Sequence, residues 1–171
     1  MNNNIEKNII PIRKHVRSQS YDYSSPGAYF VTICTHHKQC PFGAIENGIM
    51  NLNPNGQIVW KSWEDIPRHY AGISNEIFMV MPNHIHGIII IHDGNKRSGS
   101  KPDPTKKHPL SEIVRAFKSY STRHIKGTVV WQHAYYEHVI RDGKEYYEIG
   151  EYILGNPSKW DNDTENPRLR M

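Results

Sequence analysis

The alternation of apolar and polar positions predicts a strand near the middle of the chain, over residues 84–91. Ile88 to Ile91 form a continuous apolar run, which is typical of a strand that is covered on both faces and is central in its sheet. Side chains alternate between the two faces of a strand, so residues two apart point the same way. We therefore expect His84 and His86 side by side on one face, with Ile85 on the other.

The same patterns predict the remaining elements. Asn47-Gly48 is expected to turn a hairpin within residues 42–52, and Pro82-Asn83 is expected to link two antiparallel strands. Period-2 and period-3.6 patterns place the other elements: strands over 28–35, 76–81 and 129–140, and helices over 57–69, 110–125 and 144–154. This order predicts an α+β fold in which helices pack on one face of a mainly antiparallel sheet.

Length and composition limit the class of protein. A chain of 171 residues with 37% hydrophobic residues is long enough for one domain with a sizeable core. We expect a basic, partly extended arm over residues 1–20, one domain over 21–160 and a loose polar tail over 161–171. No apolar stretch is long enough to span a membrane, the N-terminus lacks the apolar segment of a signal peptide, and two cysteines favour a cytoplasmic protein.

Basic side chains suggest a polyanionic partner. The net charge is +4 and the isoelectric point is about 9.0, which favours a partner such as nucleic acid. Candidate phosphate contacts lie in the polar stretch 93–108 and on the helix expected over 110–125: Lys96, Arg97, Arg115, Lys118 and Arg123. Each of these cations is also compatible with an ordinary solvated surface.

The histidine pair is the first candidate site. Two imidazoles on one face of a rigid strand, directly after a turn, are well placed to hold a metal ion. The alternative is a pair of core histidines that are hydrogen-bonded to the backbone.

The helix expected over 110–125 carries the second candidate site. Ile113, Phe117, Tyr120 and His124 recur at helical spacing and share one face. If that face packs over the strand that displays His84 and His86, His124 becomes a third nitrogen ligand and Tyr120 a nucleophile beside a metal-polarised phosphate. The alternative is that Tyr120 and His124 lie at the edge of the core.

Several blocks of the sequence together resemble the HUH single-tyrosine transposases, the group that includes the REP-associated tyrosine transposases. The resemblance covers most of residues 15–160 and is carried by four blocks. These are Tyr21-Asp22-Tyr23 with Gly27 to Thr35, Val80 to Gly87 with its His84-Ile85-His86 motif, Ile113 to Tyr120, and a C-terminal block of Val130-Trp131-Gln132, Tyr135 to Arg141 and Tyr152 to Pro157.

The resemblance implies a ferredoxin-like or RRM-like sheet and a divalent ion, Mg or Mn, bound by His84 and His86. It implies Tyr120 as the nucleophile, with His124 in the place of the polar ligand that the family carries on its nucleophile helix. The expected reaction cleaves and rejoins single-stranded DNA with hairpin or palindromic repeats through a 5′-phosphotyrosine. Relatives act as monomers or homodimers, and Gly127 is a candidate hinge for helix exchange. Tyr135 and Tyr136 are rival nucleophiles.

Two other functions are compatible with the same residues. One is a non-catalytic RRM-like module that binds nucleic acid, in which the histidines are structural. The other is a metal-dependent phosphodiesterase in which water replaces the tyrosine.

Overall fold

The computed structural model describes residues 22–93, 108–125 and 131–170. Lys96, Arg97, Gly127 and the predicted N-terminal arm lie outside these ranges. The helices and strands in chain order are β1 (Gly27–Cys34), η1 (His36–Lys38), β2 (Gly43–Glu46), β3 (Ile49–Leu52), α1 (Pro54–Glu64), α2 (Ile66–His69), β4 (Ile73–Val80), β5 (His84–Ile91), α3 (Leu110–His124), β6 (Tyr136–Ile140), α4 (Gly143–Gly155), η2 (Pro157–Asn162) and η3 (Pro167–Arg170).

The main sheet is antiparallel and has the strand order β4-β5-β1-β6. The histidine strand β5 is therefore an inner strand, as its isoleucine run predicts. β2 and β3 form a separate hairpin, and the positive φ angles of Asn47 (52°) and Gly48 (75°) fit the predicted turn. These findings confirm an α+β fold with a mainly antiparallel sheet.

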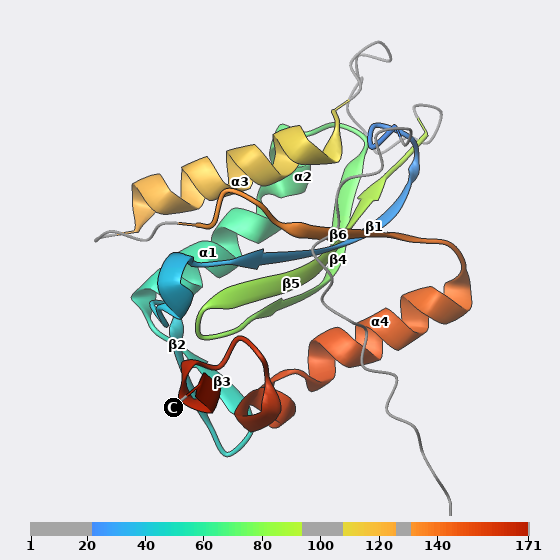
Figure 1. Cartoon of the computed structure of the whole chain (residues 1–171). Helices are drawn as coiled ribbons and strands as arrows, with labels where there is room; N and C mark the ends of the chain where they lie inside the picture. Colours follow the sequence, from blue (N-terminus) through green and yellow to red (C-terminus); the bar gives the residue numbers. More distant parts are fainter. Residues whose placement is uncertain (1–21, 94–107, 126–130, 171) are drawn as a thin grey trace, which may run out of the picture.

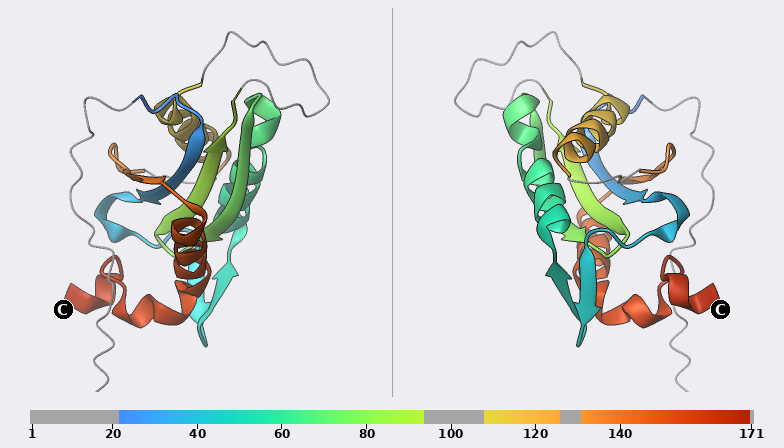
Figure 2. Two further views of the ribbon diagram at one scale, coloured as in Figure 1. Left: turned by 90° about the vertical axis from the view of Figure 1, so that its right-hand side faces the viewer. Right: turned by 90° about the vertical axis from the view of Figure 1, so that its left-hand side faces the viewer.

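The helices cover both faces of the sheet, and not one face as predicted. In Figure 1, α3 lies above the sheet and α4 lies below it, and the side views of Figure 2 show these two helices on opposite sides of the strands. On β5, Ile85 and Ile89 pack in the core with α1 and α3, whereas Ile88 packs in a second core with Ile149 and Ile153 of α4. An apolar run that alternates between two faces needs cover on both.

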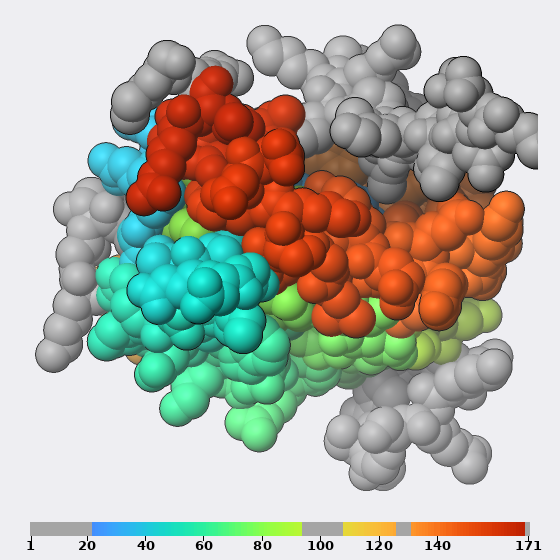
Figure 3. All heavy atoms as spheres, turned by 90° about the horizontal axis from the view of Figure 1, so that it is seen from below, coloured from blue at the N-terminus to red at the C-terminus, as the bar shows by residue number. Residues whose placement is uncertain are grey.

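The segment after Trp160 packs against the domain, so the prediction of a loose tail was wrong. Asn166 is buried, and its side-chain amide donates to the carbonyl of Trp160 at 3.0 Å. Figure 3 shows α4 and this segment together over one face of the molecule, beside the β2–β3 hairpin. The polar composition was misleading because these polar groups are hydrogen-bonded within the protein.

None of the helices within the described ranges has the length and apolar character needed to span a membrane.

Candidate active site

His84 and His86 form a buried pair at the start of β5. Their side chains are 1% and 4% exposed, and their Nε2 atoms lie 3.0 Å apart. On the neighbouring strand β1, Cys34 pairs with His84 and Thr32 pairs with His86. The predicted alternation is confirmed, because both imidazoles lie on the α4 side while Ile85 packs on the α3 side.

Asn83 determines which nitrogen of His84 carries the proton. The Asn83 side-chain amide donates to the carbonyls of Lys38 (3.3 Å) and Glu165 (2.8 Å). These two bonds orient the amide, so its Oδ1 faces His84 Nδ1 at 2.8 Å and accepts a hydrogen bond from it. The Nε2 atom of His84 is consequently an unprotonated imidazole nitrogen that can bind a cation.

Thr32 gives His86 more freedom. Its hydroxyl lies 2.8 Å from His86 Nδ1 and can donate or accept. Two proton arrangements satisfy these distances: His86 donates from Nε2 to His84, or it donates from Nδ1 to Thr32 and leaves both Nε2 lone pairs free for one cation.

Burial keeps both imidazoles neutral. It lowers the pKa of His86 to about 3. For His84, burial is the largest of three causes that lower the pKa well below its ordinary value. The other two are the electrostatic repulsion that a protonated His84 would meet from His86 and from Lys38. Neutral imidazole is the form that ligates metal ions.

The donor set of the pair fits a divalent cation. Two ligands at about 2.1 Å from one ion, at right angles, lie about 3.0 Å apart, which is the observed Nε2 separation. Within residues 22–93, 108–125 and 131–170, however, no group of three or more His, Cys, Asp or Glu side chains is arranged to hold a metal ion. Among the His, Cys, Asp and Glu side chains of these ranges, the two histidines are therefore the donors that the structure brings together.

Tyr152 of α4 packs against His86, one member of the pair. Its ring centroid lies 5.4 Å from that of His86, and its ring also meets Phe30 edge-on. Burial is the main cause that raises the pKa of Tyr152, followed by the negative charge of Asp163. Tyr136 of β6 lies on the same face, because it pairs with Thr32 and its ring contacts Phe30.

Tyr120 and His124 do not meet the histidine pair. The buried side of α3, which includes Ile113 and Phe117, packs in the core that contains Ile85, on the opposite face of the sheet. The helix turns Ser121 inward in place of Tyr120, because the Ser121 hydroxyl accepts a hydrogen bond from Trp131 at 3.0 Å. The condition on which the two roles depended, that α3 packs over the histidine face, is not met in this structure.

Tyr120 and His124 instead form a stacked pair on the surface. Their ring centroids are 4.1 Å apart, Tyr120 is 36% exposed, and His124 Nδ1 donates to the carbonyl of Tyr120. The roles predicted for Tyr120 and His124 require contact with the histidine pair, which in this chain lies on the opposite face of the sheet.

The predicted phosphate contacts on α3 line a groove of about 780 Å³ between α3 and residues 131–135. Arg115 and Arg123 are exposed there. The Lys118 ammonium bonds to the carbonyls of Gln132 (2.8 Å) and His133 (3.1 Å), so it holds this segment in place.

Tyr152, which the sequence analysis did not name as a site residue, could have been singled out by its spacing. It lies in a predicted helix and is followed four residues later by the polar Asn156, which is the spacing of Tyr120 and His124. Asn156 is buried, and its amide donates to the Tyr152 carbonyl at 2.7 Å.

Comparisons with known proteins agree with this fold. No protein-family model matches the chain. An uncharacterized protein of Haemophilus influenzae is 40% identical over 164 residues, which cover 88% of this chain and 91% of that protein. The structure of a REP-associated tyrosine transposase bound to a REP hairpin is similar with a TM-score of 0.58 and 22% identity, over 78% of this chain and 68% of that one. The chain therefore belongs to the same family as the Haemophilus influenzae protein, and its fold is similar to that of the REP-associated tyrosine transposase.

Proposed function

We propose that this protein is a metal-dependent single-tyrosine transposase that nicks and rejoins single-stranded hairpin DNA, with Tyr152 as its nucleophile. The observation that carries the proposal is the contact between Tyr152 and His86, on the face where the two Nε2 atoms converge. Tyr120 is the rival nucleophile, and a tyrosine on the far face could reach the pair only from a second copy of the chain. A homodimer of that kind stays a prediction.

The proposed reaction conserves protons and bonds. The Tyr152 oxygen attacks the scissile phosphorus, the bond from phosphorus to the 3′ oxygen breaks, and a 5′-phosphotyrosine forms. The phenolic proton leaves through water, and the departing 3′ oxygen takes one up, so a free 3′-OH results. The reverse attack by a 3′-OH rejoins DNA without an external energy source, because a phosphodiester bond is kept throughout.

His84 and His86 would hold the divalent cation, Mg or Mn. When bound, such a cation supplies positive charge that stabilises the phosphoryl oxygens and favours the phenolate. The protein's own contribution is the orientation of both imidazoles by Asn83 and Thr32 and the packing of Tyr152 against them.

The proposed substrate follows from two sources. The similar transposase structure contains a REP hairpin, and the α3 groove of this chain presents Arg115 and Arg123. We assign these arginines to the DNA backbone, where cations give affinity without sequence preference. Lys118 would act indirectly by holding residues 132–134, and the roles of Lys96 and Arg97 stay predictions.

The test uses hairpin DNA from the flanks of the gene, labelled at the 3′ end so that the fragment joined through its 5′ phosphate keeps the label. Wild type, Tyr152→Phe, Tyr120→Phe and Tyr136→Phe are incubated with the DNA and Mn²⁺, and the products are separated on a denaturing protein gel. We expect a labelled protein band that is lost in Tyr152→Phe alone.

Other outcomes have definite meanings. A band lost only in Tyr120→Phe or only in Tyr136→Phe moves the nucleophile to that residue. Cleavage that persists in Tyr152→Phe without any labelled band favours the phosphodiesterase that uses water. Tight binding of a random single-stranded pool with neither band nor cleavage favours the non-catalytic module.

A further inference from the structure

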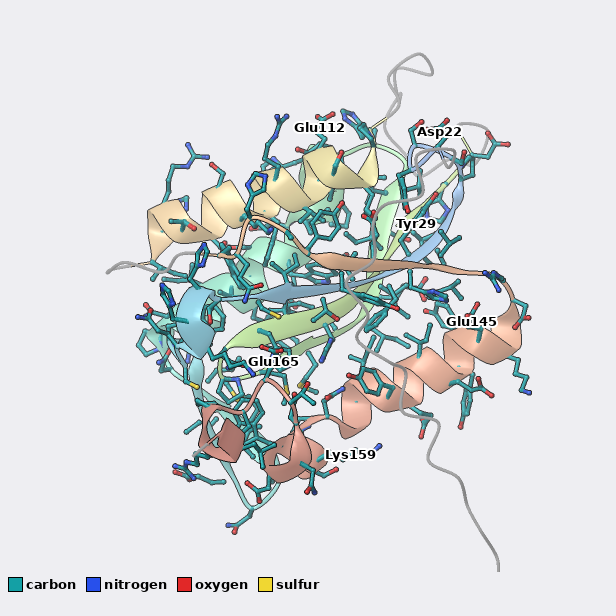
Figure 4. The ribbon with its side chains drawn as sticks, viewed as in Figure 1. Asp22, Tyr29, Glu112, Glu145, Lys159 and Glu165 are labelled. Atoms are coloured by element: carbon teal, nitrogen blue, oxygen red, sulfur yellow. The ribbon has the colours of Figure 1, made fainter. Side chains whose placement is uncertain are left out.

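The C-terminal segment 163–166 is fastened beside the histidine pair. The carbonyl of Glu165 accepts from the Asn83 amide at 2.8 Å, and the Glu165 carboxylate lies 3.7 Å from Lys38 Nζ. Lys38 also donates to the carbonyl of Thr164. Figure 4 labels Glu165 on the α4 side of the sheet, away from Glu112 of α3. The same Asn83 that orients His84 thus also fixes this segment.

This attachment brings one carboxylate to the site. Asp163 Oδ2 lies 3.7 Å from His84 Nε2, and the Asp163 side chain is 12% exposed. Its other oxygen accepts from the backbone N–H of Glu165 at 2.8 Å, which holds the carboxylate in this orientation. Four hydrogen bonds and ion pairs of the segment thus fix the position of the Asp163 carboxylate.

The contact between Asp163 and His84 is not a hydrogen bond. Its length exceeds the usual limit, and Asn83 places the His84 proton on Nδ1, so two acceptors face each other. A cation between them would satisfy both. Two ligands that each lie about 2.0–2.2 Å from one ion can be at most about 4.4 Å apart, and the separation of 3.7 Å meets this limit.

We propose that Asp163 is an oxygen ligand of the metal site, beside His84 and His86. The proposal rests on the metal-dependent function proposed above and deepens it. The three side chains do not yet surround one point, so Asp163 has to close on the ion as it binds. Its chemical consequence is ion preference, because imidazole pairs suit Zn²⁺ whereas carboxylates suit Mg²⁺ and Mn²⁺.

The experiment measures metal binding by the full chain without DNA. Calorimetric titrations with Mn²⁺ and with Zn²⁺ are compared for wild type, Asp163→Asn, Asp163→Ala and His86→Ala. Asp161→Asn is the matched control, since this aspartate is exposed and lies two residues away. Circular dichroism checks that each variant is folded.

We expect both Asp163 variants to weaken Mn²⁺ binding by at least about tenfold and to weaken Zn²⁺ binding much less. A merely structural role would weaken both ions alike. Equal Mn²⁺ affinity in wild type and Asp163→Ala, together with a loss in His86→Ala, would overturn this inference alone. Absence of Mn²⁺ binding in wild type would overturn the inference and the metal dependence of the proposed function, while the labelled-band assay would still judge the nucleophile.

Discussion

The two faces of the central sheet carry helices with the same local arrangement and different surroundings. On one face, α3 presents Tyr120 with His124 four residues later. On the other, α4 presents Tyr152 with Asn156 four residues later. Of these two helices, α4 is the one that shares its face with the histidine pair, because both histidines occupy the α4-facing positions of β5. A catalytic pattern within one helix therefore has meaning only once the face that the helix covers is known.

The largest expected difference between the two faces is in metal affinity, and it is tested by removing one histidine from each face. We expect His86→Ala to weaken Mn²⁺ binding by more than about 100-fold, since half of the buried donor pair is lost. His124→Ala should leave the affinity unchanged, because His124 Nδ1 is bonded to a helix carbonyl on the far face. Isothermal titration of both variants decides the matter, and a loss in His124→Ala would return that histidine to the site.

Gly87 of β5 tests how tightly the histidine strand is packed on its α1 and α3 side. A Cβ at Gly87 would lie 2.4 Å from Cζ2 of Trp63. Trp63 cannot easily move, because it stacks on Phe78 at 4.5 Å and meets Phe117 edge-on. We expect Gly87→Ala to lower the free energy of unfolding by about 1–3 kcal/mol, as measured by urea denaturation.

The control for this change is Gly143→Ala at the start of α4, where an added Cβ meets no atom within 4 Å. This variant should be neutral or slightly stabilising. If Gly87→Ala also left the free energy of unfolding unchanged, the contact between Trp63 and Gly87 would not contribute to the stability of the histidine strand.

The salt dependence of DNA binding tests the role proposed for the α3 groove independently of the histidine face. Arg115→Gln with Arg123→Gln should reduce the slope of log affinity against log salt concentration by about 1.4–1.8, since each phosphate contact contributes about 0.7–0.9. Fluorescence anisotropy with a labelled hairpin measures this slope. Lys61→Gln on α1, outside the groove, should leave it unchanged, and an unaltered slope in the double arginine variant would exclude the groove as a backbone contact.

A smaller effect concerns how α4 is attached to the edge strand β4. Tyr146 donates a hydrogen bond to the Glu76 carboxylate. Burial is the main cause that raises the pKa of Tyr146 to about 12, with the Glu76 bond and charge next. The folded protein thus retains this proton more strongly than the unfolded chain, whose tyrosine pKa is about 10, so the stabilisation is complete below pH 10 and is lost as the pH rises through 12.

Tyrosinate absorbance, taken as the difference between wild type and Tyr146→Phe, follows this group. Glu76→Gln should shift the transition of Tyr146 to lower pH. An unchanged transition would mean that burial alone sets the pKa.

Local patterns predicted most elements because they depend on short-range geometry. Alternation in Ala28–Thr35, the Asn47-Gly48 turn and the isoleucine run of β5 each specify an element and the residues that share one of its sides. The fold class and the adjacency of His84 and His86 follow from these features.

The features that the sequence did not predict, the face covered by α3 and the packing of the C-terminal tail, depend on long-range packing. Periodicity shows that Ile113 and Phe117 of α3 share a side with one of two next positions, Tyr120 or Ser121. It does not show that the Ser121 hydroxyl is needed by Trp131, nor which face of the sheet the helix covers. In the same way, no local pattern in residues 163–166 indicates their bonds to Asn83 and Lys38, whose positions lie about 80 residues or more earlier in the chain.

The Thr32 hydroxyl has a consequence for the speed with which the site takes up an ion. Because this hydroxyl can either donate to His86 or accept from it, the pair changes from one proton arrangement to the other when a hydroxyl turns and a proton moves. The rotation of the hydroxyl takes nanoseconds or less, and the backbone of β1 and β5 need not rearrange. In the proposed metal site, access of the ion to the buried pair, transfer of that proton and the closing of Asp163 on the ion should therefore set the rate of metal uptake, without a refolding step.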